Sequence, residues 1–537
     1  MSTDFKSPRV NILQDHPSCH DGLYYMIAPR GNAVQSRGPM ILDESGSMVW
    51  RQDGYGDVYG LKVQQYKGED YLTFWAGNDA VGGHGAGFYY MLDQSYNERY
   101  KLGAAQGLDG DLHEFLFTGE GTALITVYQI VQHDLTAIGK SATGYIWDGI
   151  IQEIDIETGE LKFMWRASEH YKVEESFFTA GGTSSSDPLD FFHINSIEKD
   201  PKGNYLISSR YMHTVTYING TDGEIIWKLG GKNSDFEDIS SGEATNFAWQ
   251  HHARWHDDYS TITLFDNGAR AGLTTADYAR GMWIKLDFEK MTAELKQAYI
   301  NPKRFISSSQ GSLQVLNNGH VLVGYGFNGV FTEFDEDGTV LCDTHFEAAS
   351  SFESGNVQSY RAYKQAWKGY PTDSPAIKVD HNIVYMSWNG ATEVSSWVIE
   401  GANSAEPADM EFYQVKTVRR AGFETLAALD DNSGSYVRVT AIDDDGNVLG
   451  YSDIVESGQS KADRGLHLTE SDTIPLKVMC GFVAIMGIGI IIWEIRTGLR
   501  LARRNRKISE DNGDSEDEAG APFMLASRRS SSEISEV

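Results

Sequence analysis

A hairpin pattern that recurs along the chain limits its fold more than any other feature of the sequence. Each copy has a short apolar strand, an acidic turn and a second strand that often carries tryptophan, as in TVTYINGTDGEIIW. The turn acids of the six copies lie 48 to 67 positions apart: Asp43, Asp93, Asp155, Asp222, Asp287 and Asp335. Asp beside Gly or polar residues is typical of turns that join antiparallel strands. The pattern therefore predicts six hairpins of similar construction.

A second hairpin precedes most of these copies. Examples are HINSIEKDPKGNYLISSR and GSLQVLNNGHVLVGY, and the 55 glycines and 12% aromatic content fit many short strands. Two hairpins form a four-stranded sheet, and six such sheets arranged radially form a six-bladed β-propeller. We expect an all-β fold with this propeller over residues 1–354. A large β-sandwich or a β-helix is the alternative, but the even recurrence of two-hairpin units favours the propeller.

The sequence changes its pattern after the expected propeller. Residues 355–458 contain successive short strands, which predicts a β-sandwich similar to a fibronectin type III module. Residues 459–473 are polar and predict a linker. Residues 474–495 are almost uncharged and long enough for a single transmembrane helix, with a buried core helix as the alternative. Residues 496–537 are basic and then acidic and serine-rich, which predicts a disordered cytoplasmic tail.

Charges that follow the apolar segment predict the orientation of the chain. Because basic residues directly after a span stay cytoplasmic, the propeller should be luminal or extracellular in a single-pass membrane protein. The acceptor sequence that starts at Asn219 agrees with glycosylation in such a compartment. The polar amino-terminal segment is not a signal peptide, so we expect that a signal has been removed or lost.

Cysteine content and net charge limit the kinds of site that the chain can contain. Cys19 and Cys342 could form a disulfide if the two ends of the propeller meet, whereas Cys480 lies in the apolar segment. No CxxC or Cys/His pattern indicates structural zinc. The formal net charge of −31 argues against nucleic-acid binding, because phosphate backbones repel such a surface.

Histidines at matching positions of three successive hairpins form the candidate site. His113, His193 and His251 each stand at the start of a hairpin, four residues before an apolar residue. If these hairpins supply the innermost strands, the three imidazoles point towards one end of the central axis. Arg210 ends the hairpin that His193 begins, and Arg254 follows His251 closely. Imidazoles beside arginine predict an anion-binding site that contains a nucleophile.

Each of these residues also has a structural interpretation. A histidine at a strand start is often satisfied by a turn, and Arg210 could be a pairing residue. Three histidines could instead bind a divalent metal ion, but the nearby arginines would repel it, so we expect no metal and no cofactor. His252 either contacts substrate together with Arg254 or points away from His251, as neighbours on a strand do.

The remaining histidines and the glycine-rich segments carry weaker signals. His133, His170 and His256 lack the repeat relation, so surface or turn positions are expected. The segment GGHGAG at residues 82–87 predicts a flexible loop, and residues 139–141 do not follow the glycine that a Walker motif needs.

Several motifs resemble the arylsulfotransferase family in its fungal branch. They include DLHEF, DFFHINSIEKDPKGNYLISSR, WKLGG and WQHHARWHDDYSTITLFDNG, and they spread over most of residues 20–345. The resemblance implies a six-bladed propeller that moves a sulfuryl group from a phenolic sulfate ester to a phenol without a nucleotide donor, through a covalent sulfohistidine. It implies that His251 is the nucleophile, that His193 and Arg210 hold the sulfate or leaving oxygens, and that His113 assists.

This sequence departs from the bacterial members of that family. It adds a β-sandwich and a membrane segment, and its QHHAR motif has a second histidine at His252. We therefore expect a membrane-anchored sulfotransferase whose partners are a phenolic sulfate donor and a phenol acceptor. The alternatives are a non-catalytic propeller ectodomain for ligand binding or adhesion and, because DIETGELKFMW resembles a repeat of that class, a quinone-dependent dehydrogenase.

Overall fold

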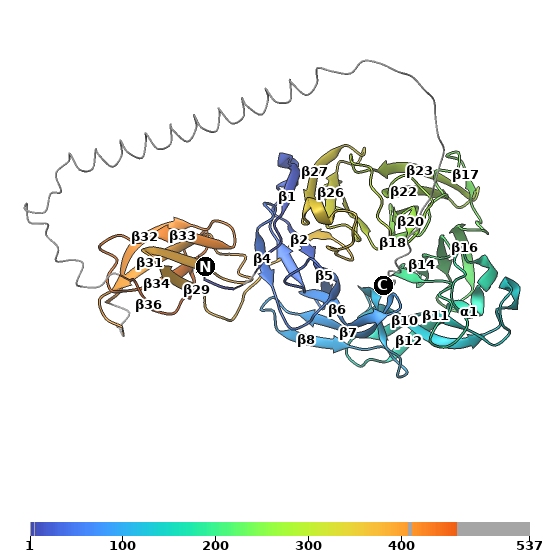
Figure 1. Ribbon diagram of the computed structural model, residues 1–537, viewed down its shortest axis with the longest axis horizontal. Helices are drawn as coiled ribbons and strands as arrows, with labels where there is room; N and C mark the ends of the chain where they lie inside the picture. The colour runs from blue at the N-terminus through green and yellow to red at the C-terminus, as the bar shows by residue number, and fades with distance from the viewer. Residues whose placement is uncertain (1, 5, 406–410, 459–537) are drawn as a thin grey trace, which may run out of the picture. The chain divides into compact units, whose positions relative to one another are not determined.

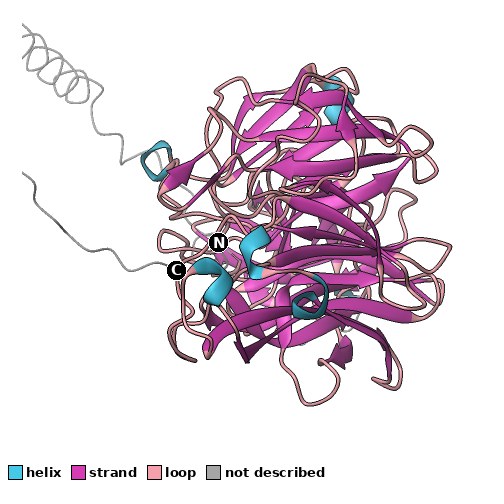
Figure 2. Cartoon of the chain, turned by 90° about the vertical axis from the view of Figure 1, so that its right-hand side faces the viewer, coloured by secondary structure: helices cyan, strands magenta, loops and turns pink. Residues whose placement is uncertain are grey.

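The described part of the chain folds almost entirely into β-strands and turns. The computed structural model describes residues 2–4, 6–405 and 411–458. The helical segments within these residues are α1 (Ala167–His170) and the 3-10 turns η1 (Pro17–Cys19), η2 (Thr136–Ile138), η3 (Val173–Glu175) and η4 (Ala349–Ser351). Figure 2 shows how little of the molecule they occupy. The predicted all-β fold is confirmed.

Groups of four antiparallel strands follow one another around a ring (Figure 1). The first group takes its innermost strand from late in the sequence and consists of β28 (Tyr363–Gln365), β2 (Tyr24–Ile27), β3 (Met40–Leu42) and β4 (Met48–Arg51). The second consists, from the inside outward, of β5 (Val58–Tyr66), β6 (Glu69–Val81), β7 (His84–Leu92) and β8 (Glu98–Leu102). The third consists of β9 (Gly110–Phe117), β10 (Thr122–His133), β11 (Gly144–Asp155) and β12 (Leu161–Arg166). One pairing, between Gly87 and Gly110, joins the second group to the third.

The ring continues with three further groups. The fourth consists of β13 (Ile194–Lys199), β14 (Tyr205–Ser209), β15 (Thr214–Ile218) and β16 (Ile225–Gly230). The fifth consists of β18 (His251–His256), β19 (Thr261–Asp266), β22 (Arg280–Asp287), β23 (Thr292–Tyr299) and the outer β17 (Glu237–Asp238). The sixth consists of β24 (Ser312–Val315), β25 (Val321–Gly324), β26 (Val330–Phe334), β27 (Val340–His345) and the outer β1 (Asn11–Gln14). A small separate ribbon pairs β20 (Ala269–Arg270) with β21 (Leu273–Thr274).

The outer hairpin of each group contains one of the six predicted turn acids. Asp43 lies between β3 and β4, and its Oδ1 accepts hydrogen bonds from the backbone N–H groups of Ser45 and Ser47. Asp287 accepts from the N–H groups of two following residues in the turn between β22 and β23. A carboxylate that satisfies these donors stabilises the turn locally, which explains why the same residue type recurs at this position.

Apolar side chains fill the space between neighbouring groups. One cluster takes Ile151 from the third group and Ile197 and Ile207 from the fourth, and all three are fully buried. The inner strands also contact one another around the ring, in the order β28, β5, β9, β13, β18 and β24. Residues at the start of each inner strand are thereby brought towards one common axis.

The ring is closed by pairing between strands from the two ends of the segment that forms it. β28 pairs with β2, so that Gln365 lies opposite Tyr24, and β1 pairs with β27. Cys19 and Cys342 form a disulfide, as the sequence suggested they could. The boundary predicted at residue 354 is too early, because the innermost strand of the first group lies at Tyr363–Gln365. That strand is only three residues long and has no hairpin partner adjacent to it in sequence.

The residues after β28 form two further sheets with a shared core. One contains β29 (Ala376–Asp380), β30 (Ile383–Ser387) and β33 (Glu424–Ala428), and the other contains β31 (Ser396–Ala402), β32 (Tyr413–Arg419), β34 (Tyr436–Ile442), β35 (Val448–Tyr451) and β36 (Val455–Glu456). Met386 of the first sheet and Trp397 and Val439 of the second belong to one buried apolar cluster.

The described residues contain no helix that is long and apolar enough to cross a bilayer. The predicted linker, transmembrane helix and tail, together with Cys480, fall within residues 459–537 and lie outside the described part of the chain.

Candidate active site

The starts of three inner strands bring the predicted histidines together on one side of the ring. His113 lies in β9, His193 directly precedes β13 and His251 is the first residue of β18. All three side chains are buried, and the ring centroids of His113 and His193 are 4.7 Å apart. His251 is close enough to both for their charges to affect its pKa. The matching positions in the sequence therefore become neighbouring positions in space.

Arg210 joins this group through the backbone. Its N–H donates to the carbonyl oxygen of His193 over 2.8 Å, which fixes it beside the start of β13. Its Nη2 donates to the carbonyl oxygen of Ser308 over 2.8 Å, and its guanidinium carbon lies 5.4 Å from the ring centroid of Tyr211. The side chain has no carboxylate partner among the ion pairs of the described residues, so its charge is available to a bound anion.

A carboxylate holds Nδ1 of two of the histidines. His113 Nδ1 lies 2.6 Å from Asp111 Oδ2, and His193 Nδ1 lies 2.5 Å from Asp190 Oδ2. Burial alone would raise the pKa of both carboxyl groups, but the adjacent imidazoles lower it overall. Burial lowers the pKa of His193 to about 3, although the Asp190 carboxylate opposes that shift. The two aspartates therefore orient both rings.

His251 is held by an amide instead of a carboxylate. Its Nδ1 lies 2.7 Å from Asn267 Oδ1, and Asn267 Nδ2 donates to the carbonyl oxygens of Ser307 and Gln310. Because the amide nitrogen faces two acceptors, Oδ1 must face the imidazole, and Nδ1 of His251 must carry the proton. Nε2 then carries the lone pair, and it accepts a long 3.3 Å hydrogen bond from the N–H of Gln310.

Electrostatics keep His251 neutral. Burial lowers the pKa of its imidazole well below the ordinary 6.5, and the positive charge of Arg210 lowers it further, whereas the bond to Asn267 opposes the shift. A neutral imidazole with a defined tautomer and a lone pair on Nε2 is the state in which histidine acts as a nucleophile.

Strained backbone also occurs at residues that lie near the starts of the inner strands. His193, Trp249, His252 and Gln310 have φ values between 58° and 63°, in the left-handed region that residues with a Cβ seldom occupy. Such conformations cost about 1–3 kcal/mol each and persist where the surrounding structure requires them. All four positions lie at or next to the start of an inner strand.

Sequence reasoning missed several residues of this site. Tyr360 and Gln310 precede β28 and β24 by a few positions, so they occupy the places in their groups that histidines occupy in others. The ring centroid of Tyr360 lies 5.7 Å from that of His113 and 6.4 Å from that of His251. Aligning the starts of all the inner strands would have identified both residues.

The segment predicted as a flexible loop supplies another missed residue. Residues 82 and 83 form the turn into β7, and His84 is fully buried next to His113 and His193, with ring centroids 5.9 and 5.0 Å away. A Cβ on Gly85 would lie 2.6 Å from the Trp75 side chain. The glycines thus permit close packing around His84, and the loop prediction is wrong.

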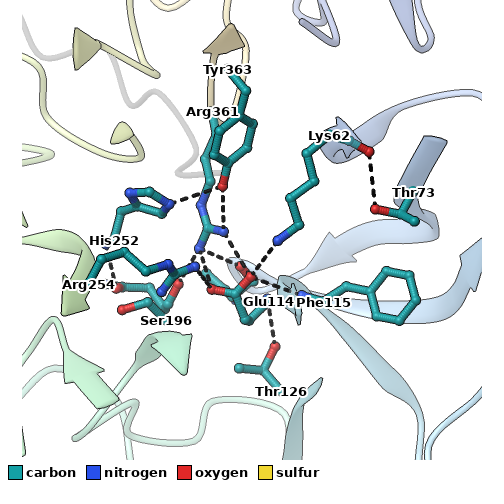
Figure 3. A network of polar contacts seen from close by, with 12 residues as sticks. Lys62, Thr73, Glu114, Phe115, Thr126, Ser196, His252, Arg254, Arg361 and Tyr363 are labelled. Atoms are coloured by element: carbon teal, nitrogen blue, oxygen red, sulfur yellow. Dashed lines mark hydrogen bonds and ion pairs between the residues drawn. The ribbon is translucent and has the colours of Figure 1, made fainter. Parts of the chain in front are cut away.

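His252 and Arg254 lie in a different cluster, around Glu114 (Figure 3). Arg254 Nη2 and Lys62 Nζ contact the Glu114 carboxylate, and Arg361 donates to both of its oxygens over 2.9 and 3.1 Å. His252 Nε2 lies 3.0 Å from the hydroxyl of Tyr363, in the same cluster. A cavity of about 440 Å³ is lined in part by Lys62, His252, Arg254 and Tyr363.

The geometry therefore separates Arg254 and His252 from His251. His252 is adjacent to His251, and neighbouring residues on a strand point to opposite faces. Arg254 lies three residues further along β18, past a shift in its pairing register with β19, and its guanidinium contacts Glu114. Of the two interpretations given for His252, the one in which it points away from His251 agrees with these contacts.

The other histidines named from the sequence lie outside both clusters. His170 stacks on Trp165 with centroids 4.9 Å apart, and His256 bonds to Thr263. His133 ends β10 and is half-buried. Asn219, the predicted glycosylation site, is half-buried in the turn between β15 and β16, where its Oδ1 accepts from the N–H of Thr221.

Known proteins similar to this chain were identified by family and by structure. The family model Arylsulfotransferase (ASST) matches residues 62–347. No curated protein sequence matches the chain. Similar solved structures include a protein of unknown function from Bacteroides caccae, with 12% identity and a TM-score of 0.37, covering 64% of this chain and 99% of that one. The Cps50 (Swd1) β-propeller domain of Myceliophteria thermophila has 10% identity and a TM-score of 0.34, covering 72% of this chain and 94% of that one.

Proposed function

Because the chain belongs to the arylsulfotransferase family, we propose that it moves a sulfuryl group from a phenolic sulfate ester to a phenol through a sulfohistidine at His251. The observation that carries the proposal is the state of that imidazole. Asn267 places the ring proton on Nδ1, and burial with the charge of Arg210 keeps Nε2 unprotonated. The long hydrogen bond from Gln310 is weak enough to be given up when a sulfur atom approaches.

The reaction divides into two half-reactions. In the first, the Nε2 lone pair forms a bond to sulfur while the bond from sulfur to the donor oxygen breaks, and a phenolate leaves with that electron pair. In the second, the oxygen of the acceptor phenol forms a bond to sulfur while the nitrogen–sulfur bond returns its electrons to Nε2. The acceptor's proton passes through solvent to the phenolate released in the first half-reaction, so that no net proton is gained or lost. By analogy with phosphoryl transfer, positioning and electrostatics supply most of the rate.

The neighbouring residues have defined roles in this proposal. Arg210 stabilises the sulfuryl oxygens and the charge on the leaving oxygen, because it is a buried cation near His251. His193 and His113 line the position of the sulfate from the side of β13 and β9. Asn267 stabilises the positive charge that develops on the imidazole as Nε2 bonds to sulfur, since its Oδ1 already accepts the Nδ1–H. Tyr360 offers a ring to the aryl group of the substrate.

The proposal extends to the architecture and the location of the protein. We assign the six strand groups to the blades of a six-bladed propeller and the two later sheets to a β-sandwich. We also propose the membrane-anchored, fungal-type form, with the propeller luminal or extracellular, Asn219 glycosylated and residues 474–495 in the bilayer. The disulfide between Cys19 and Cys342 supports an oxidising compartment.

Incubation of the purified protein with 4-nitrophenyl sulfate and phenol tests the reaction. We expect release of 4-nitrophenol, formation of phenyl sulfate, and a protein that gains the mass of one SO₃ group on His251 when the acceptor is withheld. His251→Ala should lose all three signals, whereas His256→Ala, on the same strand but outside the site, should keep them. No transfer by the folded protein across a broad panel of phenolic sulfates would favour a ligand-binding role.

A further inference from the structure

His84 is buried without a satisfactory hydrogen bond. It is fully inaccessible to solvent and stacks on Tyr128 with ring centroids 3.8 Å apart. Its Nε2 lies 3.1 Å from Asp190 Oδ2, yet within the described residues neither ring nitrogen makes a well-aligned hydrogen bond. Asp190 Oδ1 is also buried without a hydrogen-bond partner there. Polar atoms left in this condition cost about 1–3 kcal/mol each, and each such case calls for a physical explanation.

Two sets of potential ligands share this histidine. His84, Asp190 and His193 each offer one ligand atom within 4.8 Å of the others, and His84, Asp111 and His113 do the same. All five side chains are buried. Each set has two imidazoles and one carboxylate, a combination that binds first-row transition metals in many proteins.

The charge of this group suits a divalent cation. Two carboxylates face three imidazoles, and no ion pair connects Arg210 to either aspartate. The sequence-based argument against a metal assumed that arginine lies among the histidines. Arg210 instead bonds to Ser308 and acts on His251, so it leaves His84, Asp111 and Asp190 as a separate, acidic group.

We infer that His84, Asp190 and His193 bind one divalent first-row transition-metal ion beside the sulfuryl-transfer site. Two imidazole donors favour an ion of this class over Mg²⁺ or Ca²⁺, which prefer oxygen ligands throughout. His84 is a dedicated ligand, because it has no role in the proposed transfer reaction and no other partner that satisfies its ring nitrogens.

The ion would also define how His193 meets the substrate, a consequence that rests on the proposed function. A carboxylate can only accept a proton, so His113 and His193 in their metal-free pairs carry the ring proton on Nδ1. Neutral rings in that state present a lone pair at Nε2, which repels an anionic sulfate. When a metal binds Nδ1 of His193, the ring proton moves to Nε2 without net proton release, and this ring becomes a donor to sulfate oxygens, whereas His113 keeps its metal-free state.

Metal content of the full chain tests the site without reference to catalysis. We expect about one ion per chain by mass spectrometry of the purified protein, or after removal with a chelator and re-addition of Zn²⁺ or Mn²⁺. Zn²⁺ should raise the thermal midpoint of the metal-free protein by about 3 °C or more, whereas Mg²⁺ should not. The inference is overturned if the folded protein binds less than about one-tenth of an ion and its midpoint does not respond to either transition metal.

Matched variants show whether a bound ion occupies this site. His84→Phe keeps the stack on Tyr128 and should lower metal occupancy at least about tenfold, while His170→Phe should leave it unchanged. If His84→Phe does not fold, Asp190→Asn replaces it as the test variant. It preserves side-chain shape and should also weaken metal binding. Equal occupancy in the wild type and in both folded site variants would contradict the inference. His251→Ala should lose sulfuryl transfer but keep the ion, so that either proposal can fail alone.

Discussion

Adjacent residues on the same inner strands build two buried clusters of opposite character. On β9, His113 faces the imidazole–carboxylate group while Glu114 faces the cation-rich group. On β18, His251 belongs to the first cluster and Arg254 to the second. One ring of inner strands therefore holds two different chemistries at different positions along the same strands.

The two clusters also differ in how completely their charges are paired. Glu114 has three cationic partners, Lys62, Arg254 and Arg361, and each is bound directly to its carboxylate. In the other cluster, Arg210 has no carboxylate partner among the described residues, and the ring nitrogens of His84 make no well-aligned hydrogen bond there. The comparison suggests that the Glu114 cluster maintains the ring and that the histidine cluster is open to ligands. Four predictions test this difference.

The largest effect on stability should come from Glu114. In Glu114→Gln, three buried cations lose their common anion, and breaking a buried ion network in this way costs about 3–5 kcal/mol. Denaturant-induced unfolding should show that loss, whereas Glu120→Gln, at an exposed surface pair, should change the free energy of unfolding by less than about 0.5 kcal/mol. Equal unfolding midpoints for Glu114→Gln and wild type would contradict the proposal that the Glu114 cluster maintains the ring.

Arg210 should matter for the reaction and little for the fold. Arg210→Ala removes a donor to the developing charge and should lower kcat/KM by a factor that corresponds to about 2–4 kcal/mol. Arg254→Ala should mainly lower the free energy of unfolding, because the partner of Arg254 is Glu114. Steady-state kinetics on both variants, with unfolding measured in parallel, checks the contrast, and a larger kinetic loss for Arg254→Ala would reverse it.

Asn267 should affect the reaction through His251. Asn267→Leu removes the acceptor that fixes the proton on Nδ1, and loss of such an orienting partner costs about 10–100-fold in activity. Because Asn267 does not contact the phenol, kcat should fall while KM changes little. Asn267→Asp keeps an acceptor oxygen at this position. If it restores part of kcat, the loss in Asn267→Leu comes from the tautomer of His251 and not from a packing defect.

The smallest effect should be that of pH on the nucleophile. A lowered pKa means that the neutral form persists as the pH falls, so His251 should remain unprotonated well below 6.5. We expect kcat/KM to show no loss from His251 between about pH 7 and 5.5, unlike an exposed histidine. A decline with a midpoint near 6.5 that Asn267→Asp shifts upward would show that the imidazole titrates normally.

The repeat pattern predicted the parts of this molecule that depend on local sequence. The six turn acids stabilise the outer hairpins, and the matching histidines meet because equivalent positions in a ring face the same axis. Asp111 and Asp190 precede their histidines by two and three residues, so that signal was also present in the sequence. The paired cysteines agreed with closure of the ring.

Other features depended on contacts that no local pattern carries. Glu114 meets Arg361 across 247 residues, and Asn267 reaches His251 from the end of another strand. His84 looked like part of a glycine-rich loop, because the close packing that requires Gly85 comes from Trp75. Arg254 and His252 were grouped with His251 by proximity in sequence, but in space Arg254 contacts Glu114 and His252 contacts Tyr363.

The closing strand β28 has a consequence for synthesis of the chain on the ribosome. Strands β2, β3 and β4 leave the ribosome early, but the edge of β2 has no inner neighbour until residues 363–365 have been translated. During that interval, most of the ring must exist with an open seam, and an exposed strand edge is a template for pairing with other molecules. Recombinant fragments that stop at residue 354 would make this transient state permanent, so we expect them to aggregate where fragments that include β28 remain dispersed.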